Sequence, residues 1–242
     1  MQKIKEFQVL ISCLLVCLVV LISSLIFASK IQRNENITVT GSAYKIVTSD
    51  SAKLTVQVKT KAPNLKDAYE KMKVQQPKVV DYLLSKGIDK KDIEIKTFGG
   101  YYNYKSLPGG GTNMNEPVSY NGEQNIEFKS NDVNKIKEIS TDIQNLTSSG
   151  LNIWVMQPEY YYSDLGKVKI DLLKEAALDA KQRAASMLSA TGSKVGKVQQ
   201  MKMGVFQITP PDSTMVSDYG YNDTTTIDKK VTAVTNVVFK VK

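Results

Sequence analysis

The chain has 242 residues, of which 42% are hydrophobic and 23% are charged, a balance that suits one large or two small globular domains. A formal net charge of +8 suits an anionic partner, and it also fits a lysine-coated surface that only faces water. Histidine is absent and both cysteines lie in the N-terminal apolar run, which excludes Ser-His-Asp and Cys-His catalysis, histidine-bound zinc and thiol chemistry in the rest of the chain.

The N-terminal part of the chain predicts a membrane anchor. Residues 9–28 contain no charge and follow a short cytoplasmic head, residues 1–8. As a helix this run spans about 30 Å, the thickness of the hydrocarbon core of a bilayer. The apolar region of a cleaved signal peptide is shorter, about 7–15 residues, so a retained single-pass helix is favoured and cleavage is the alternative.

The location follows from this anchor and from the cysteine count. A body without cysteine suits an extracytoplasmic bacterial setting, where stray thiols are a liability. We therefore expect a protein of the bacterial cell membrane with its main domain outside the cytoplasm. If the segment is cleaved, the protein is secreted or periplasmic.

Residues 29–36 are expected to link the anchor to the main domain, which we place at residues 37–242. This domain opens with two strands, predicted over residues 37–47 and 52–60. In the second strand, apolar residues alternate with polar ones, so one face of the sheet is expected to be wet.

The first helix of the domain is predicted between Asn64 and Gly87. Asn64 is a suitable N-cap, and Gly87 is a suitable residue just beyond the C-terminus. Pro77 lies inside this helix, where it lacks a backbone donor and crowds the preceding turn. The sequence therefore predicts a kink or a break near Gln76.

A long hairpin is expected next. It consists of a strand over residues 92–104, a loop over 107–117 and a partner strand over 119–130. The loop contains three adjacent glycines, but the Lys-Ser/Thr pair of a phosphate-binding loop does not follow them. We therefore assign no phosphate site to it.

Two more helices alternate with strands in the following part. One helix is predicted over residues 132–148, then a strand over 151–164 and an alanine-rich helix over 165–190 that stops at Gly192. Small residues let a helix axis lie close to its neighbour, which we expect to be the protein's own sheet. The predicted contact face comprises Leu173, Ala176, Ala177, Ala180, Ala184, Met187 and Leu188.

A strand over residues 194–208, a polar loop over 209–226 and a closing strand over 230–242 complete the chain. Strands that come in adjacent pairs with helices between them indicate an α+β fold. We expect mostly antiparallel sheets with helices packed on one face, preceded by a single N-terminal transmembrane helix.

Four stretches of the body, in this order, resemble those of a known family: ITVTGSAYKIVTSDSAKLTVQV, LLSKGIDKKDIEIKT, EAALDAKQRAASMLSATGSKVGKV and VTAVTNVVFKVK. The body resembles the SIMPL-domain family of bacterial periplasmic and surface proteins. The resemblance implies an α+β fold, an extracytoplasmic location and self-assembly into a ring- or channel-like homo-oligomer. It supplies no catalytic residue.

Two patterns in the sequence are candidate catalytic sites. Ser42 and Lys45 fit S-x-x-K, but on a strand the two side chains point to opposite faces. Glu159 and Asp164, beside the tyrosines at 160–162, could serve a glycosidase or line a sugar site. Tyrosine is also frequent in strands, so structure alone explains that cluster as well.

A third pattern concerns metals. Four aspartates could offer oxygen ligands, but their spacing fits no calcium loop: Asp212, Asp218, Asp223 and Asp228. The sequence therefore assigns no catalytic, cofactor-binding or metal-binding residue.

These observations favour a non-enzymatic, membrane-anchored, extracytoplasmic protein that self-assembles in the cell envelope. The first alternative is a lysine-rich module that binds anionic envelope polymers, and the second is a hydrolase that uses carboxylates. No cofactor and no nucleic-acid partner are expected, since no recognition motif for nucleic acid is present.

Overall fold

The computed structural model describes residue 11 and residues 14–25 and 35–242. Residues 11 and 14–25 are helical, and within these described ranges no helix is long and apolar enough to cross a membrane. Residues 9, 10, 12, 13 and 26–28 of the anchor predicted over residues 9–28, and all of the head over residues 1–8, lie outside the described residues. The linker lies outside them up to residue 34.

The described body forms two compact units. The first comprises the chain up to Ser42 together with Leu173–Gly204 and Val234–Lys242, and the second comprises Ala43–Leu172 and Val205–Ala233. Strands β1 and β11 and helix α4 cross the boundary and contribute to both units.

The second unit is built on a six-stranded sheet of described residues in the order β3-β5-β2-β6, with β4 beside β5 and β7 beside β2. Every pairing in it is antiparallel, and β2 and β5 pair over eleven positions. The strands are β2 (Ser51–Ala62), β3 (Ile93–Ile95), β4 (Gly99–Ser106), β5 (Thr112–Ser130), β6 (Ile153–Val155) and β7 (Glu159–Tyr161).

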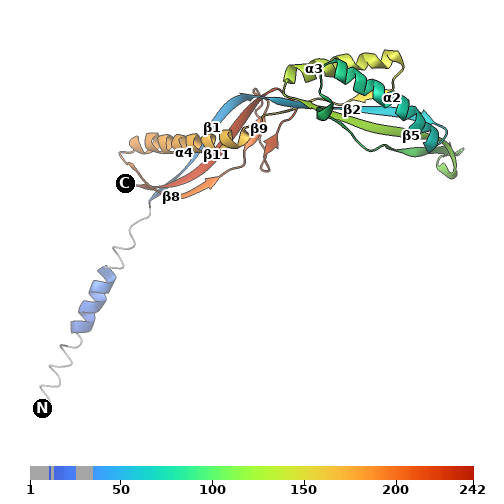
Figure 1. Cartoon of the computed structure of the whole chain (residues 1–242). Coiled ribbons are helices and arrows are strands. Elements are labelled where there is room, and N and C mark those ends of the chain that lie inside the picture. Colours follow the sequence, from blue (N-terminus) through green and yellow to red (C-terminus); the bar gives the residue numbers. More distant parts are fainter. Residues whose placement is uncertain (1–10, 12–13, 26–34) are drawn as a thin grey trace. The chain divides into compact units, whose positions relative to one another are not determined.

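One face of this sheet is covered by helices α2 (Leu65–Ser85) and α3 (Val133–Asp142), which lie side by side over it (Figure 1). A 3₁₀ helix, η2 (Ile143–Ser149), continues α3. The opposite face carries no described helix. The largest core lies between sheet and helices and includes Leu54, Val56, Val58, Met72, Leu83, Ile126, Phe128, Ile136 and Ile139.

Helix α2 begins and ends as predicted but does not break. The side chain of Asn64 accepts a hydrogen bond of 2.9 Å from the backbone N–H of Asp67, and Gly87 has the left-handed φ of 77°. A kink or a break was expected near Gln76; the helix is continuous through Pro77, so there is no break. Pro77 and Lys73 are both exposed, so water can bind the carbonyl that the proline leaves without a partner.

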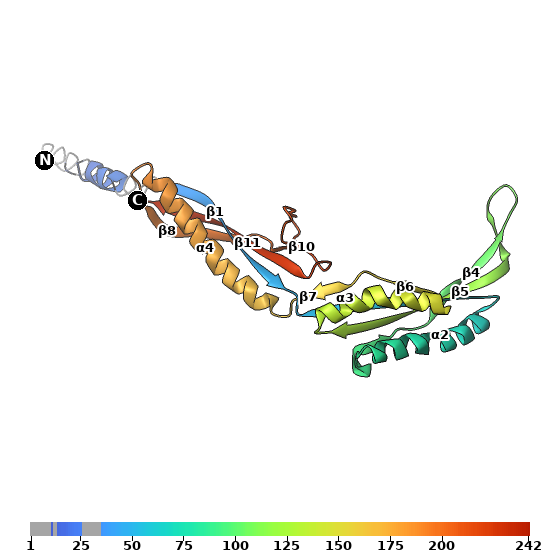
Figure 2. The same ribbon diagram turned by 90° about the horizontal axis from the view of Figure 1, so that it is seen from above.

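The predicted hairpin is present with different bounds. The strand expected over residues 92–104 is divided into β3 and β4, both paired with β5 and preceded by a 3₁₀ turn, η1 (Lys90–Asp92). The loop expected over 107–117 is shorter, because β5 already begins at Thr112 and the three glycines alone supply the positive φ angles of the turn. Figure 2 shows this hairpin extending past helices α2 and α3.

Two other elements also differ from the prediction. The helix expected over residues 132–148 changes to 3₁₀ geometry at Ile143 and ends at Gly150, whose φ is 85°. The strand expected over 151–164 is divided into β6 and β7, on either side of Pro158, which has no N–H to donate to a ladder.

In the first unit, parts of β1 (Asn36–Thr48) and β11 (Asp228–Val241) form a sheet with β8 (Val195–Met203). Helix α4 (Leu165–Ser189) packs on it through Ala180 and Ala184, which contact Val39, Val237 and Phe239 in a small core. The alanine face therefore covers the protein's own sheet, as predicted.

The contact face of α4 is narrower than predicted. Positions four residues apart are buried, namely Val168, Leu172, Ala176, Ala180, Ala184 and Leu188, whereas Met187 is 56% exposed. The reason is Gly41 of β1: a Cβ added there would lie 2.1 Å from the carbonyl oxygen of Ala176. Near Gly41, helix α4 and strand β1 approach so closely that only the small side chains of Ala176 and Ala180 fit between them.

In the second unit, β9 (Gln207–Thr209) pairs antiparallel with β11 and parallel with β10 (Tyr221–Asn222). Both lie in the segment predicted as the end of a strand and a polar loop. The α+β fold with mostly antiparallel sheets is thereby confirmed.

Candidate functional site

The serine–lysine pattern forms no site. Ser42 and Lys45 both lie on β1, exposed and three positions apart, so their side chains point to opposite faces of the strand. The backbone N–H of Ser42 instead donates a hydrogen bond of 2.8 Å to the carboxylate of Asp179 on α4.

Glu159 lies in an ion pair and not in a pair of carboxylates. Its carboxylate is 3.2 Å from Nζ of Lys53 and accepts a hydrogen bond from the hydroxyl of Tyr161. The bond from Tyr161 and the charge of Lys53 hold the pKa of Glu159 below its ordinary value, and the same bond raises the pKa of Tyr161 to about 12. A carboxylate kept ionised in this way is a poor general acid.

The four aspartates of the predicted oxygen set do not converge. Asp212 and Asp218 are exposed, Asp228 accepts a hydrogen bond of 2.7 Å from the hydroxyl of Thr48, and Asp223 is buried. Within the described part of the chain, no group of three or more potential ligands could hold a metal ion.

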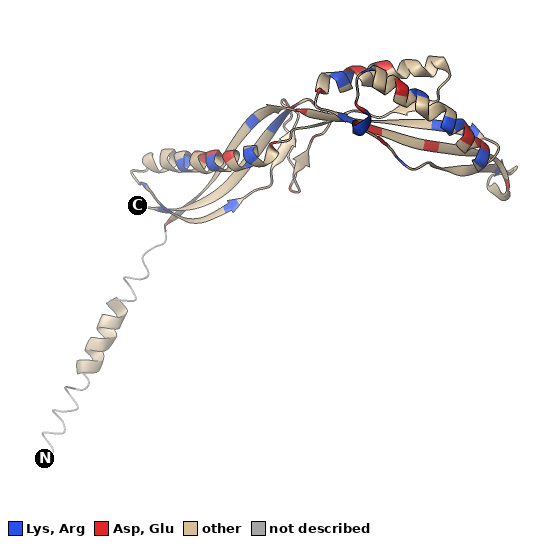
Figure 3. Ribbon diagram, viewed as in Figure 1, with Lys and Arg blue, Asp and Glu red and all other residues tan. Residues whose placement is uncertain are grey.

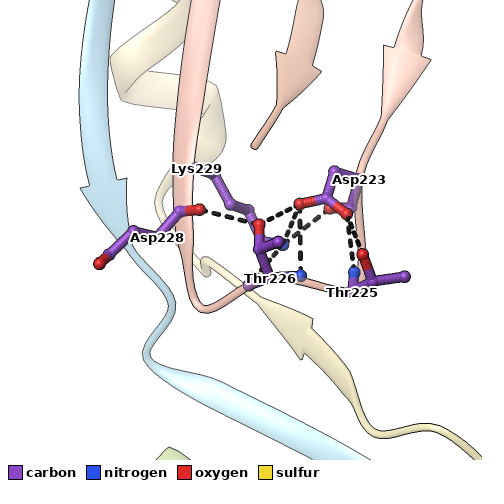
Figure 4. Close-up of polar contacts among 5 residues, drawn as sticks. All are labelled: Asp223, Thr225, Thr226, Asp228 and Lys229. Atoms are coloured by element: carbon purple, nitrogen blue, oxygen red, sulfur yellow. Dashed lines mark hydrogen bonds and ion pairs between the residues drawn. The ribbon is translucent and has the colours of Figure 1, made fainter. Parts of the chain in front are cut away.

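Asp223 belongs to a polar cluster in the second unit, in which Asp223 and Lys229 are buried, Thr226 is half-buried and Thr225 is exposed (Figure 4). Its carboxylate accepts four hydrogen bonds, from the backbone N–H and the hydroxyl of both threonines. Nζ of Lys229 lies 3.6 Å from that carboxylate and donates to the carbonyls of Asp223, at 2.8 Å, and Thr226, at 2.7 Å.

Burial and hydrogen bonding act in opposite directions on this pair. Burial disfavours the charge of Asp223, but the bonds from Thr226 and Thr225 and the charge of Lys229 outweigh it, so the pKa of Asp223 is lowered. Burial lowers the pKa of Lys229, and attraction to Asp223 offsets only part of that effect. The cluster ties the polar loop to the start of β11, which is a structural role.

We expect the stability of the protein to fall in acid partly through Asp223. Its folded pKa lies below the unfolded value of about 3.9, so its contribution is complete above that pH and is lost as the pH falls through the folded pKa. Thr226→Val removes a donor and should move this loss to higher pH. Urea midpoints of both proteins between pH 6 and pH 2.5 test this, and superimposable pH profiles would contradict it.

The helix-free face of the second unit's sheet is polar, charged and aromatic, and it carries Glu123 and Glu127 on β5 as well as lysines on β2. The term helix-free face denotes the side chains of β2, β5, β6 and β7 that point away from α2 and α3. They alternate along each strand with the buried core residues. Trp154, 61% exposed, lies on this face opposite Gln57, and Gln57 lies opposite Asn125. Nζ of Lys59 lies 5.3 Å from the centroid of the Trp154 ring.

A hollow of about 390 Å³ adjoins the helix-free face at the start of β2. Lys53 and Lys129, directly opposite each other on β2 and β5, line it together with Tyr161, Asn131 and Ser51. Like charges at opposite positions of a sheet repel, and Glu159 pairs with Lys53 alone. Lys129 is exposed and makes no ion pair with any described residue.

Strand β8 is an outer edge of the first unit's sheet, because it pairs with β11 and with no other described strand. Its apolar side chains continue the buried face of β11 beyond the strip that α4 covers. Three exposed residues lie opposite buried ones: Val198 opposite Phe239, Met201 opposite Val237 and Met203 opposite Thr235.

A family model, SIMPL, described as proteins of unknown function (DUF541), matches residues 37–239. The chain belongs to the SIMPL family. The match begins on β1 and ends on β11, so the SIMPL region spans both units. The comparison with curated proteins found no match for this chain.

Sequence reasoning missed the most distinctive parts of this SIMPL protein. Lys229 lies between the predicted loop over residues 209–226 and the predicted strand over 230–242 and was given no role, and Trp154 and Lys129 were not singled out. The run Asp-Thr-Thr-Thr at 223–226 was a usable signal, because aspartate followed by threonines favours local side-chain to backbone hydrogen bonds.

Proposed function

We propose that this SIMPL protein is a non-enzymatic, membrane-anchored component of the bacterial cell envelope whose extracytoplasmic domain self-associates. The observation that carries the proposal is the free edge β8 with its exposed row of apolar residues. A strand edge with unpaired backbone groups and uncovered apolar side chains is a template for pairing with another chain. We infer that the partner is a second copy of this chain.

The two edges of the first unit's sheet differ in a way that supports this choice. On β1, the backbone N–H of Ser42 is bonded by Asp179, whose carboxylate also holds Arg183 at 2.7 Å. No comparable side chain among the described residues caps β8. Lys202 lies on the opposite face of β8 from the apolar row, so it leaves that row open.

The carboxylates support a role without catalysis. A glycosidase requires one carboxyl group with a raised pKa to act as the acid. Among the described residues, each aspartate or glutamate with a resolved shift has a lowered pKa, as Glu159 and Asp223 illustrate. The anchor rests on the uncharged run over residues 9–28.

Light scattering of the full chain in detergent, coupled to size exclusion, tests self-association. We expect a molar mass that rises with concentration to a multiple of the 26.9 kDa chain. Met201→Lys together with Met203→Lys should weaken association at least tenfold, because charge replaces the apolar row.

Met114→Lys is the matched control for this experiment. Met114 is 66% exposed, like Met203 at 61%, but lies on strand β5 of the second unit and not on β8. A protein that stays monomeric over the whole concentration range, or a control as damaging as the β8 variant, would refute the role of β8.

A second candidate function is binding of anionic envelope polymers. Acidic and basic residues are interspersed over the helices and strands, so the net charge alone marks no binding surface (Figure 3). Two lysines beside a hollow, of which Glu159 neutralises Lys53 and no described residue forms an ion pair with Lys129, are the local feature that favours this function. Binding of this kind is expected to weaken with salt.

A further inference from the structure

We propose that the helix-free face binds an anionic glycan, with a sugar ring on Trp154 and an acidic group in the hollow between Lys53 and Lys129. The proposal rests on the second candidate function and gives it a site and a ligand class. It is independent of self-association through β8.

The platform for the sugar ring is Trp154. A tryptophan with 61% of its surface exposed on a sheet offers a broad apolar ring whose negative face attracts the positively polarised C–H groups of a pyranose. Lys59 contacts the ring at 5.3 Å, which helps to fix its orientation. Because the ring of Trp154 stays exposed, the fold gains little free energy from burying it, and a ligand that covered the ring would gain that free energy on binding.

Amide groups flank this platform in the same row across three strands. Gln57 lies opposite both Trp154 and Asn125, so ring and amides form one continuous line. The side-chain oxygen of Asn125 is buried and receives no hydrogen bond from any described residue. This oxygen is closed to a ligand while it stays buried, so the row offers a ligand the ring of Trp154 and the half-buried amide of Gln57.

The hollow supplies the second half of the site. Lys53 and Lys129 both line it, whereas the hydroxyl of Tyr161 is already donated to Glu159, so the lysines are the groups available to an anion. Glu159 neutralises only one of the two lysines. A carboxylate or phosphate bound there would relieve the repulsion between them.

The separation of the two halves decides the size of the ligand. Gln57 and Lys53 are four residues apart on β2, which is about 13 Å along a strand. One sugar unit cannot occupy both places, so the ligand is an oligosaccharide or polysaccharide with acidic substituents. An acidic peptide would use the lysines but would gain nothing from the amide and aromatic row.

The test uses the full chain in detergent with four polymers: polyglucuronate, a phosphorylated mannan, a neutral glucan and polyglutamate. Trp154 is the chain's one tryptophan, so its fluorescence reports directly on binding at the helix-free face. Calorimetry then compares the variants. The first two polymers distinguish a carboxylate from a phosphate as the acidic group.

We expect one or both anionic glycans to change the fluorescence and to bind at least tenfold more tightly than the glucan or polyglutamate. Trp154→Ala should weaken binding at least tenfold, and Lys129→Gln several-fold with a smaller salt dependence. Matched controls are Lys137→Gln on α3 and Tyr219→Ala, which is 97% exposed in the polar loop, and both should bind as the wild type does.

Three results would overturn the proposal. If no anionic polymer binds, the second candidate function fails with it. If anionic polymers bind but Trp154→Ala and Lys129→Gln leave the affinity unchanged, that function stands and the site is wrong. If polyglutamate binds as tightly as the tighter-binding of the two anionic glycans, the ligand is not recognised as a glycan.

Discussion

Replacing Gly41 with alanine should destabilise the protein by about 3 kcal/mol, the upper part of the usual range for overpacking. The new Cβ would lie 2.1 Å from the carbonyl oxygen of Ala176 and 2.5 Å from the backbone nitrogen of Ala180. Both are main-chain atoms of helix α4, so no side-chain rotation can make room. The helix itself would have to move away from β1.

Gly166→Ala is the matched control for this change. Gly166 lies in the first turn of the same helix, and nothing would lie within 4 Å of its added Cβ. Alanine there should be neutral or stabilising by up to about 1 kcal/mol, since it has the higher helix propensity. Thermal unfolding of the full chain, followed by circular dichroism, measures both. A Gly41→Ala protein as stable as the wild type would mean that α4 does not pack on β1 in this way.

Lys229→Met should cost about 3–5 kcal/mol, because it leaves the buried carboxylate of Asp223 without its cation. It also leaves the carbonyls of Asp223 and Thr226 without the ammonium that bonds them. The loop that the cluster ties down should become sensitive to protease at concentrations that leave the wild type intact.

The neighbouring lysine gives the control. Lys230 donates one hydrogen bond of 2.7 Å to the carbonyl of Ser213 and forms no ion pair with a described residue, so Lys230→Met should cost only about 1 kcal/mol. Asp223→Asn combined with Lys229→Met should lose less than the sum of the two single changes. Additive losses in urea unfolding would show that Asp223 and Lys229 are not coupled.

The helices of this protein were largely predictable because their signals are local. Asn64 and Gly87 bound α2, Gly192 follows the end of α4, and the alternation in β2 marked its buried face. Of the kink or break predicted at Pro77, the break does not occur, since the cost of a proline depends on whether its freed carbonyl faces solvent. Strand bounds were less accurate because a strand ends where its partner ends, and the partner is distant in sequence.

The candidate surfaces could not be predicted from neighbouring residues, because the strands that form them are also distant in sequence. Nothing near Lys129 in the sequence shows that it lies opposite Lys53, and nothing near Trp154 shows that Gln57 and Asn125 extend its row. The burial of Lys229 follows from the loop that folds over it.

The sequence by itself determined the α+β class, the SIMPL membership, the boundaries of α2 and α4 and the absence of imidazole and of thiols outside the N-terminal run. These depend on composition and on neighbours along the chain. Only the tertiary structure decided which residues meet: the close contact of Gly41 with α4, the buried pair Asp223 and Lys229, the open edge β8 and the helix-free face. Side chains that meet across a sheet are set by register, and register is fixed by the packing of the whole core.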